Sequence, residues 1–377
     1  MPDLFEYTDE FGPSKIIHVY EPSAGLKGIL VVDNVSRGPS IGGVRMASDV
    51  SLGECLRLAR AMTLKNAAAD LPHGGGKSVI AGDPSMPRPR KEQVVRAFAM
   101  ALRNVEEYIF GPDMGTDETC MAWVKDETGR AVGLPRELGG IPLDEIGATG
   151  YGLFCAVETA LDMAGTSLKG ARVVVQGFGA VGSNAARFLV GNGAVLVAAS
   201  DSKGGTVNPH GLDIEELTAL KHAGRSVSES VNGKAVEKEA LIGVECEIWI
   251  PAARPDVIHE HNVGSLRTRM VVQGANIPVT PGAEEYLYRQ GILSVPDFIA
   301  NAGGVICAAM EYHGETETQA MKVVGEKIRR NTRQVLDDAK RKQVPPREAA
   351  IRLATERIRK AMGFRRFSLF SSAPHFL

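Results

Sequence analysis

Apolar residues in the first part of the chain alternate between β-type runs and helical stripes. The runs 16–20 and 29–32 are rich in β-branched residues and flank a glycine-containing loop, so they predict a pair of strands. The further elements predicted here are a helix at 52–70, a strand at 78–81, a helix at 91–108 and a buried strand at 108–110. This alternation of strands and helices indicates an α/β fold for the first domain.

Two lysines in the segment 41–77 occupy unusual positions. Ser51 and Glu54 have the spacing of a helix-opening capping box, and the apolar stripe of the helix that follows also contains Lys65. The apolar members of this stripe are Cys55, Leu58, Met62 and Ala69. Lys77 follows three consecutive glycines, which suit a turn with unusual dihedral angles and let a ligand approach the backbone. Lys65 taken alone fits a side chain that snorkels to the rim. Together the lysines indicate one cavity in which one ammonium holds an anion and the other, its pKa lowered, acts as a base.

The middle of the chain carries a dinucleotide-binding pattern. A short apolar strand at 172–176 leads into Gly177-Phe178-Gly179-Ala180-Val181-Gly182, and a helix is predicted over 183–190. A second strand at 195–200 ends at Asp201, at about the 20-residue spacing of the Rossmann fingerprint. The glycines are therefore expected to bring a pyrophosphate to the helix N-terminus, and Asp201 to accept hydrogen bonds from the adenosine ribose. The alternative is a Rossmann-like unit that holds no dinucleotide.

Later apolar runs extend this second sheet and predict where its ligands lie. Strands are predicted at 248–250, 270–272 and 292–295, and helices at 149–164, 315–342 and 347–362. The residues after the strands include Ala252, Asn276 and Asn301, at the edge where a doubly wound sheet binds its ligands. Each asparagine is equally well explained as a turn residue.

Length, charge and cysteine content narrow the class of protein. The 377 residues favour two domains, and 43 basic against 45 acidic side chains give a net charge of −2, which offers no support for a nucleic-acid partner. The N-terminus lacks the pattern of a secretory signal and no apolar run is long enough to span a bilayer, so a cytoplasmic location is expected. The five cysteines are scattered without metal-ligand spacing, which predicts buried thiols and no zinc site.

Several ordered motifs resemble the glutamate/leucine/phenylalanine/valine dehydrogenase family. They are Gly42-Gly43-Val44-Arg45, Met62-Thr63-Leu64-Lys65-Asn66, Gly74-Gly75-Gly76-Lys77, Asp113-Met114-Gly115-Thr116, Ala148-Thr149-Gly150-Tyr151-Gly152, the glycine loop, Gly274-Ala275-Asn276 and Asn301-Ala302-Gly303-Gly304-Val305. The resemblance implies an α/β fold of two domains around a cleft. Residues 1–145 would bind substrate and form a homo-oligomer, with a C-terminal helix at 347–377 returning to them, and residues 146–346 would form a Rossmann-type NAD-binding domain.

The resemblance also implies roles for individual residues. Lys65 matches the lysine that binds the substrate α-carboxylate, Lys77 the catalytic lysine and Asp113 the catalytic acid. These roles agree with oxidative deamination, in which a lysine of lowered pKa takes a proton from water and a carboxylate exchanges protons with the amino nitrogen. The residues expected on the cofactor side are Thr149, Gly177, Gly179, Ala180, Val181, Gly182, Asp201, Ser202, Ala252, Asn276 and Asn301, of which Asn301 also lines the cleft.

The substrate expected from the resemblance is an apolar L-amino acid. Glutamate-specific members have a lysine before the Gly-Gly pair and a serine five positions after the first glycine of Asn-Ala-Gly-Gly, whereas this chain has Ile41 and Ala308 there. The pocket is therefore expected to consist of Ile41, Gly42, Gly43, Gly111, Val305 and Ala308, together with Lys65 and Asn301. A leucine, valine, isoleucine or phenylalanine substrate is favoured, since a carboxylate buried without a partner costs several kcal/mol.

Other features leave alternatives open. The segments 113–115 and 201–205 resemble the glutamate branch more closely, so a glutamate dehydrogenase with an atypical pocket is one alternative, and a non-catalytic dinucleotide-binding regulator is another. Asp201 would repel a 2′-phosphate and favours NAD, whereas Ser202 and Lys203 beside it leave NADP open.

Overall fold

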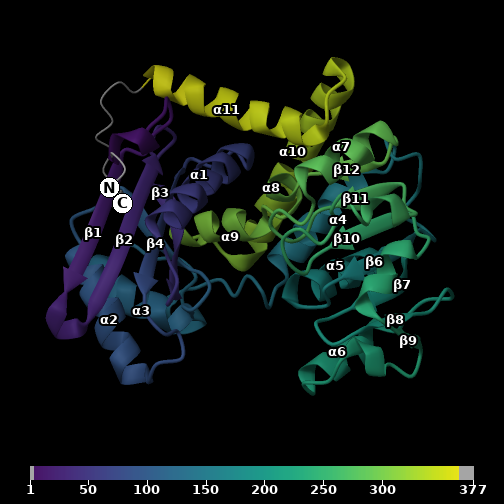
Figure 1. The fold of residues 1–377 in the computed structure, drawn as a ribbon, viewed down its shortest axis with the longest axis horizontal. Helices are drawn as coiled ribbons and strands as arrows, with labels where there is room; N and C mark the ends of the chain where they lie inside the picture. The colour runs from purple at the N-terminus through teal and green to yellow at the C-terminus, as the bar shows by residue number, and fades with distance from the viewer. Residues whose placement is uncertain (1–3, 365–377) are drawn as a thin grey trace. The chain divides into compact units, whose positions relative to one another are not determined.

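The computed structural model describes residues 4–364 and divides into two compact units (Figure 1). Of the described residues, the first unit comprises 4–142, 305–320 and 353–364, and the second comprises Leu143–Gly304 and Met321–Arg352. Contacts thus group 305–320 with the first unit, whereas the sequence-based division kept 146–346 together. Of the C-terminal segment expected to return to the first domain, residues 365–377 lie outside the described residues.

The first unit is built on a five-stranded mixed sheet in the order β1-β2-β4-β3-β5. Its strands are β1 (Lys15–Glu21), β2 (Leu26–Asn34), β3 (Ser40–Ala47), β4 (Gly74–Ala81) and β5 (Tyr108–Pro112), and its helices include α1 (Leu52–Ala68), α2 (Arg88–Ala101) and α3 (Glu118–Thr128). The predicted strand pair is confirmed as antiparallel β1 and β2, and β3 runs parallel to both β4 and β5. Successive residues of β2 point to opposite faces, so Leu30 and Val32 pack with α2 and α3 while Val31 packs with α1.

The three glycines before Lys77 form a strand rather than the predicted turn. They lie in β4, and a Cβ atom at Gly75 would lie 2.0 Å from the backbone nitrogen of Thr63, while one at Gly74 would lie 1.8 Å from the carbonyl oxygen of Asn34. The glycines are therefore required because α1 and β2 pack directly against the strand backbone. Strand β3 was not predicted for a related reason, because its glycine pair weakens the β signal.

Helix α1 begins as predicted but buries the predicted face only in part. Ser51 caps it, accepting the backbone N–H of Glu54 at 3.2 Å. The buried positions of the helix are Cys55, Ala59, Thr63, Asn66, Ala67 and Ala68. Of the predicted stripe, Cys55 and Ala69 are buried, whereas Leu58, Met62 and Lys65 lie at the border of this face and are only half-buried. The correction arises because the close approach of β4 selects small side chains for the buried face.

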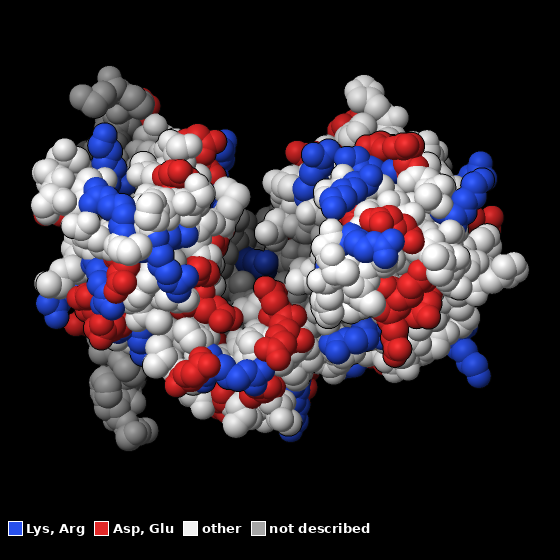
Figure 2. Space-filling view, turned by 90° about the horizontal axis from the view of Figure 1, so that it is seen from below, with Lys and Arg blue, Asp and Glu red and all other residues white. Residues whose placement is uncertain are grey.

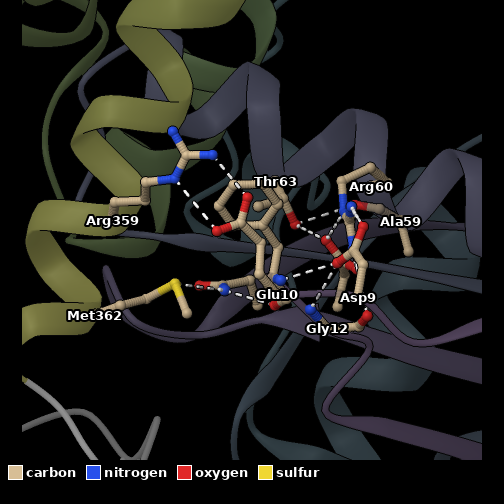
Figure 3. Close-up of polar contacts among 11 residues, drawn as sticks. Asp9, Glu10, Gly12, Ala59, Arg60, Thr63, Arg359 and Met362 are labelled. Carbon is tan, nitrogen blue, oxygen red and sulfur yellow. Dashed lines mark hydrogen bonds and ion pairs between the residues drawn. The ribbon is translucent and has the colours of Figure 1, made fainter.

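The N-terminal segment and α11 (Pro346–Phe364) are tied to the first unit by a polar cluster (Figure 3). Arg60 on α1 bonds Asp33 at 2.8 Å and Asp9 at 2.6 Å, and Thr63 donates its hydroxyl to Asp33 at 2.6 Å. Arg359 on α11 pairs with Glu10 at 2.6 Å. These contacts fix α1, the helix that carries Lys65.

The second unit contains a seven-stranded sheet in the order β12-β11-β10-β6-β7-β8-β9. Its strands are β6 (Arg172–Gln176), β7 (Val195–Ser200), β8 (Gly205–Val207), β9 (Lys234–Val236), β10 (Ile248–Pro251), β11 (Met270–Val272) and β12 (Leu293–Val295). Its helices include α4 (Ala148–Ala160), α5 (Ala180–Gly191), α6 (Ile214–His222), α7 (Pro281–Arg289) and α8 (Asp297–Ala300). The strands from β12 to β7 are parallel, as in a Rossmann sheet, while β8 and β9 are antiparallel.

Most predicted elements of the second unit are confirmed, but its two short antiparallel edge strands, β8 and β9, were missed. The predicted strands 172–176 and 195–200 coincide with β6 and β7. β8 and β9 have three residues each, too few for an alternating pattern to be recognised. The last helices are α9 (Gly303–Tyr312), α10 (Glu317–Lys342) and α11, each shared between the two units, and the predicted helices 315–342 and 347–362 are confirmed as α10 and α11.

Charge and cysteine placement agree with the sequence. Basic and acidic side chains are interspersed on the face shown in Figure 2. All five cysteines are buried and free, as predicted for core thiols. Within residues 4–364, no helix is both long and apolar enough to cross a bilayer, and no group of three or more possible ligands is arranged to hold a metal ion.

Candidate functional site

A buried ion pair between Lys77 and Asp113 is the chemical centre of the first unit. Lys77 lies on β4 and is 5% exposed, while Asp113 directly follows β5, and the two side chains form an ion pair. Strand β3 separates β4 from β5 in the sheet. A Cβ atom at Gly43 of β3 would lie 2.8 Å from the Asp113 Cβ and 3.0 Å from the Lys77 Nζ, so glycine is needed for the ion pair to form.

The neighbouring glycines have different packing roles. A Cβ atom at Gly42 would lie 1.9 Å from the carbonyl oxygen of Gly76, so the glycine pair lets β3 and β4 approach closely. The Gly42 carbonyl accepts the hydroxyl of the buried Tyr108 at 2.8 Å. At Gly111, by contrast, the nearest neighbour of an added Cβ would be Val132 at 3.4 Å, which is an ordinary van der Waals distance. Packing therefore does not require this glycine.

The environment of Lys77 lowers its proton affinity. Burial, followed by the positive charge of Arg45, lowers the pKa of Lys77 to about 7, and Lys65 contributes in the same direction. A large share of the Lys77 side chains is therefore neutral near pH 7 and able to accept a proton. The structure thus brings the predicted Lys65, Lys77 and Asp113 into one electrostatic cluster within the first unit.

Arg45 is a member of this cluster that the sequence analysis did not assign. One terminal nitrogen of its guanidinium lies 3.4 Å from Asp113 Oδ1, and the other bonds Glu54 at the start of α1. Arg45 lies two residues after Gly43 on β3, so both face the same side of the sheet. The two-residue spacing from Gly43 could have predicted that Arg45 lies beside the ion pair. That prediction required knowing that β3 is a strand, which the sequence analysis did not recognise.

The predicted side-chain pocket residues also belong to the first unit. Ile41 is 4% exposed on β3, opposite Gly75 on β4 and Ile109 on β5. Val305 and Ala308 lie on α9 and are half-buried. None of the three side chains offers a charge or a hydrogen-bond donor to a second carboxylate.

The glycine loop of the second unit has the geometry of a pyrophosphate site. Gly177 has a positive φ of 97° and its Cβ would lie 2.7 Å from Ala253, while a Cβ at Gly182 would lie 2.0 Å from the Gly177 carbonyl. Gly179, the N-cap of α5, has no atom within 4 Å of its added Cβ, and no side chain caps the helix. The first-turn N–H groups, including those at Ala180 and Val181, are thus available to an anion.

A cavity of about 680 Å³ adjoins this loop. Its lining includes Gly177, Gly179, Asp201, Ser202 and Ala252. All of these were predicted on the cofactor side, and all belong to the second unit.

Asp201 lies at the expected place but its carboxylate is fully engaged. Lys221 pairs with Oδ2 at 2.8 Å, the Ser226 hydroxyl donates to Oδ1 at 2.9 Å, and backbone N–H groups of Lys203 and Val227 complete four bonds. Burial alone would raise the pKa of Asp201, but Lys221 and these hydrogen bonds outweigh it and lower the pKa to about 2. The acceptor positions expected to meet the ribose are therefore taken by the protein itself.

The two predicted asparagines form a second polar cluster in the same unit. Asn301 donates its amide to the carbonyl oxygen of Gly274 at 3.2 Å and to Asn276 Oδ1 at 3.1 Å. The Oδ1 atom of Asn301 is buried without a partner, which leaves one acceptor for a ligand amide. Thr149, on the first turn of α4, lies beside Gly304, whose added Cβ would be 3.2 Å from the threonine hydroxyl.

Comparisons with known proteins agree with this arrangement. Residues 13–130 match the family model described as the Glu/Leu/Phe/Val dehydrogenase dimerisation domain, and residues 139–366 match the one described as Glutamate/Leucine/Phenylalanine/Valine dehydrogenase. The NADP(+)-dependent glutamate dehydrogenase of Pyrobaculum calidifontis is 36% identical over 363 residues, covering 89% of this chain and 86% of that protein.

Two solved structures match nearly the whole chain. The hetero-hexameric glutamate dehydrogenase from Thermus thermophilus in its Leu-bound form has a TM-score of 0.82 and 31% identity, covering 95% of this chain and 91% of that one. The L-tryptophan dehydrogenase from Nostoc punctiforme has a TM-score of 0.76 and 26% identity, covering 95% of this chain and 99% of that one. The predicted resemblance and fold class are confirmed, and the chain belongs to the glutamate/leucine/phenylalanine/valine dehydrogenase family of NAD- or NADP-dependent amino-acid dehydrogenases.

Proposed function

We propose that the protein catalyses the reversible oxidative deamination of L-glutamate to its 2-oxo acid and ammonia with a nicotinamide dinucleotide. The observation that carries the reaction type is the buried Lys77–Asp113 ion pair, in which the lysine is poised to lose its proton near neutral pH. The choice of glutamate is supported by the names of relatives 35 to 40% identical to this chain. The sequence-based preference for an apolar substrate is therefore the second candidate.

The roles of the residues follow from their chemistry. The bound dinucleotide supplies a hydride acceptor for the substrate Cα. Lys65 holds the α-carboxylate by charge, while neutral Lys77 takes a proton from the water that attacks the iminium carbon. Asp113, paired with Lys77, exchanges a proton with the amino nitrogen. Burial of Lys77 limits the access of bulk water to its ammonium group.

An apolar L-amino acid is the second candidate because of Ile41 and Ala308. Both stand where the resemblance expects groups that neutralise a side-chain carboxylate, and neither can do so. The similarity to a tryptophan dehydrogenase shows that the fold also serves an aromatic substrate. This candidate covers leucine, valine, isoleucine and phenylalanine types.

Turnover of an amino-acid panel separates the candidates. The purified protein is incubated with NAD or NADP and one amino acid at a time: glutamate, leucine, valine, isoleucine, phenylalanine or tryptophan. Formation of NADH or NADPH is followed by its absorbance. Preference for glutamate supports the proposal, whereas turnover of apolar amino acids alone would overturn it in favour of the second candidate. No turnover in either direction, with dinucleotide binding retained, would support a regulator instead.

The Ile41→Lys variant sharpens the panel. If glutamate is the substrate, its side-chain carboxylate is held elsewhere or gains a partner, so kcat/KM for glutamate is unchanged or rises. If the substrate is apolar, a buried ammonium penalises leucine by several kcal/mol. An Ile41→Val variant is the matched control because it keeps the pocket apolar.

We propose that the cofactor site accepts NADP as well as NAD. The negative charge of Asp201, which favoured NAD in the sequence analysis, is compensated by Lys221, and both line the cavity with Ser202. The ratio of kcat/KM for the two dinucleotides measures this directly. Exclusive use of NAD would contradict the proposal.

We propose that the first unit forms a homo-oligomer. β1 is an edge strand of the sheet, and Tyr20 on it is 67% exposed beside a surface hollow that also includes Ile29 and Val79. The matching family model is described as a dimerisation domain and covers this strand. Light scattering of the Tyr20→Lys variant is expected to give a smaller species than the unmodified chain.

A further inference from the structure

Four charged side chains form a continuous chain across the first unit. Glu54, in the first turn of α1, bonds one terminal nitrogen of Arg45 on β3. The other terminal nitrogen lies 3.4 Å from Asp113 Oδ1, which also accepts the backbone N–H of Met114 at 2.6 Å, and Lys77 pairs with Asp113 Oδ2. The Arg45 Nε is buried without a hydrogen-bond partner, so the guanidinium is held through its two ends.

We propose that Arg45, anchored by Glu54, is a positioning residue that holds Asp113 in place and sets the protonation of Lys77. This inference rests on the proposed proton-transfer role of Lys77. No comparison assigns a role to Arg45 or Glu54, and both lie on elements that also carry expected site residues: β3 carries Gly43 and α1 carries Lys65.

The arrangement answers a difficulty of the reaction itself. Lys77 must be neutral to take a proton from water, and its attraction for Asp113 then weakens. A guanidinium remains protonated throughout the accessible pH range. Arg45 therefore helps the Met114 backbone N–H to keep Asp113 Oδ1 fixed during the step in which neutral Lys77 attracts Asp113 less strongly.

Arg45 and Glu54 also change the pKa of Lys77, in opposite directions. After burial, the positive charge of Arg45 lowers this pKa most, whereas Glu54 raises it. The other groups facing Lys77 are Lys65, which lowers its pKa, Asp113, its ion-pair partner, and Cys55, whose own pKa burial raises to about 12 and which therefore stays neutral. Removing Arg45 or Glu54 thus has opposite consequences for the same proton.

Substitutions at Glu54 and Arg45 test this balance. In Glu54→Gln the amide still accepts the bond from Arg45 but the negative charge is lost, so the pKa of Lys77 falls. In Arg45→Met the pKa rises and Asp113 loses a partner. We expect the two substitutions to shift the pKa of Lys77 by about one unit in opposite directions, which is the lower end of the usual effect of a nearby charge on a pKa. In the Arg45→Met/Glu54→Gln double variant the shifts offset each other, while kcat stays reduced roughly tenfold or more because Asp113 Oδ1 then keeps only the bond from the Met114 backbone N–H.

Two readouts separate this inference from the proposed function. The pH dependence of Lys77 acetylation by acetic anhydride, followed by peptide mass spectrometry, reports its pKa without any turnover, and the exposed Lys125 on α3 in the same digest is an internal reference. The low-pH limb of kcat/KM, measured with the panel's best amino acid, reports the same pKa in the free enzyme through its effect on turnover. If the panel shows no turnover, the labelling shift alone still decides whether Arg45 and Glu54 control Lys77.

Control variants exclude a general loss of structure. Arg96→Met breaks an ion pair with Glu92 on α2 in the same unit and is expected to move neither readout. Arg45→Lys keeps the charge but not the two-ended guanidinium, so the Lys77 pKa stays near that of the unmodified protein while kcat falls. Shifts of the same sign in Glu54→Gln and Arg45→Met, or none in Glu54→Gln, which preserves the packing, would overturn the inference.

Discussion

Each unit contains a lysine–aspartate ion pair, and the two pairs bury opposite partners. In the first unit the Lys77 side chain is 7% exposed and that of Asp113 18%. In the second unit the Asp201 side chain is 6% exposed and that of Lys221 33%. Burying the cation lowers the pKa of Lys77 to about 7, whereas burying the anion among donors lowers the pKa of Asp201 to about 2.

The difference shows how one residue pair serves two purposes. Asp201 receives hydrogen bonds from a hydroxyl and two backbone N–H groups as well as from Lys221, so its charge is fixed at any working pH. Lys77 loses its charge easily chiefly because it is buried, and then because Arg45 and Lys65 add positive charge nearby. Burial together with the charge and hydrogen bonds of the neighbouring groups, rather than the pair itself, decides which pair can exchange protons.

Removing the two lysines is expected to give the largest contrast. Lys77→Met deletes the proposed base and lowers kcat by roughly 10²- to 10⁴-fold, the usual contribution of general acid–base catalysis. Lys221→Met leaves kcat within about threefold, because Lys221 only pairs a carboxylate whose other bonds remain. Steady-state rates with the best amino acid of the panel measure both, and circular dichroism verifies folding. Equal losses in kcat would remove the distinction between the pairs.

Crowding the reactive pair is expected to have the next largest effect. Gly43→Ala places a methyl group 3.0 Å from Lys77 Nζ and 2.8 Å from Asp113 Cβ, so the ion pair shifts. A displacement of about 1 Å at a reacting group costs roughly 100-fold in kcat/KM. Gly53→Ala in α1, where the added Cβ meets no atom within 4 Å, is the control and should keep full activity. An active Gly43→Ala enzyme would argue against this geometry.

The pH dependence of kcat/KM is expected to show a smaller difference between the Lys77–Asp113 and Lys221–Asp201 pairs. Since Lys77 must be neutral, kcat/KM is expected to fall about tenfold per pH unit below a pKa near 7. Asp201, with its pKa at about 2, contributes nothing to this limb. The profile of Asp201→Asn should therefore overlay that of the unmodified enzyme. An acid limb that moves in Asp201→Asn would show that the second pair also titrates in the working range.

The smallest expected change in activity accompanies a measurable change in stability. Asp201→Asn leaves donors of the second pair without a charged acceptor and lowers the free energy of unfolding by about 1–3 kcal/mol at pH 7. Because the folded-state pKa is lowered from 3.8 to about 2, this stabilisation is present above pH 4 and is lost as the pH falls through 2. Urea unfolding at pH 7 and pH 3 is the measurement. A stability difference that grows toward acid pH would contradict the assignment.

The sequence by itself determined the elements whose signal is local. β6, β7 and α10 have apolar runs or periodicity that no distant contact is needed to interpret, and they were predicted nearly to the residue. The order of the motifs identified the family, and the G-x-G-x-x-G loop predicted where a dinucleotide binds. Lys65, Lys77 and Asp113 could be named because the motifs carry them.

Only the tertiary structure decided how the glycines and charges act. Gly43 and Gly75 have no side chain to signal a strand, and their necessity becomes visible only when α1, β4 and Asp113 are packed around them. The role of Arg45 likewise depends on Glu54 and Asp113, which are distant from it in the sequence. That of Asp201 depends on Lys221 and Val227. A residue's proton affinity and free acceptor sites are properties of its folded surroundings, which residue type and spacing along the chain do not specify.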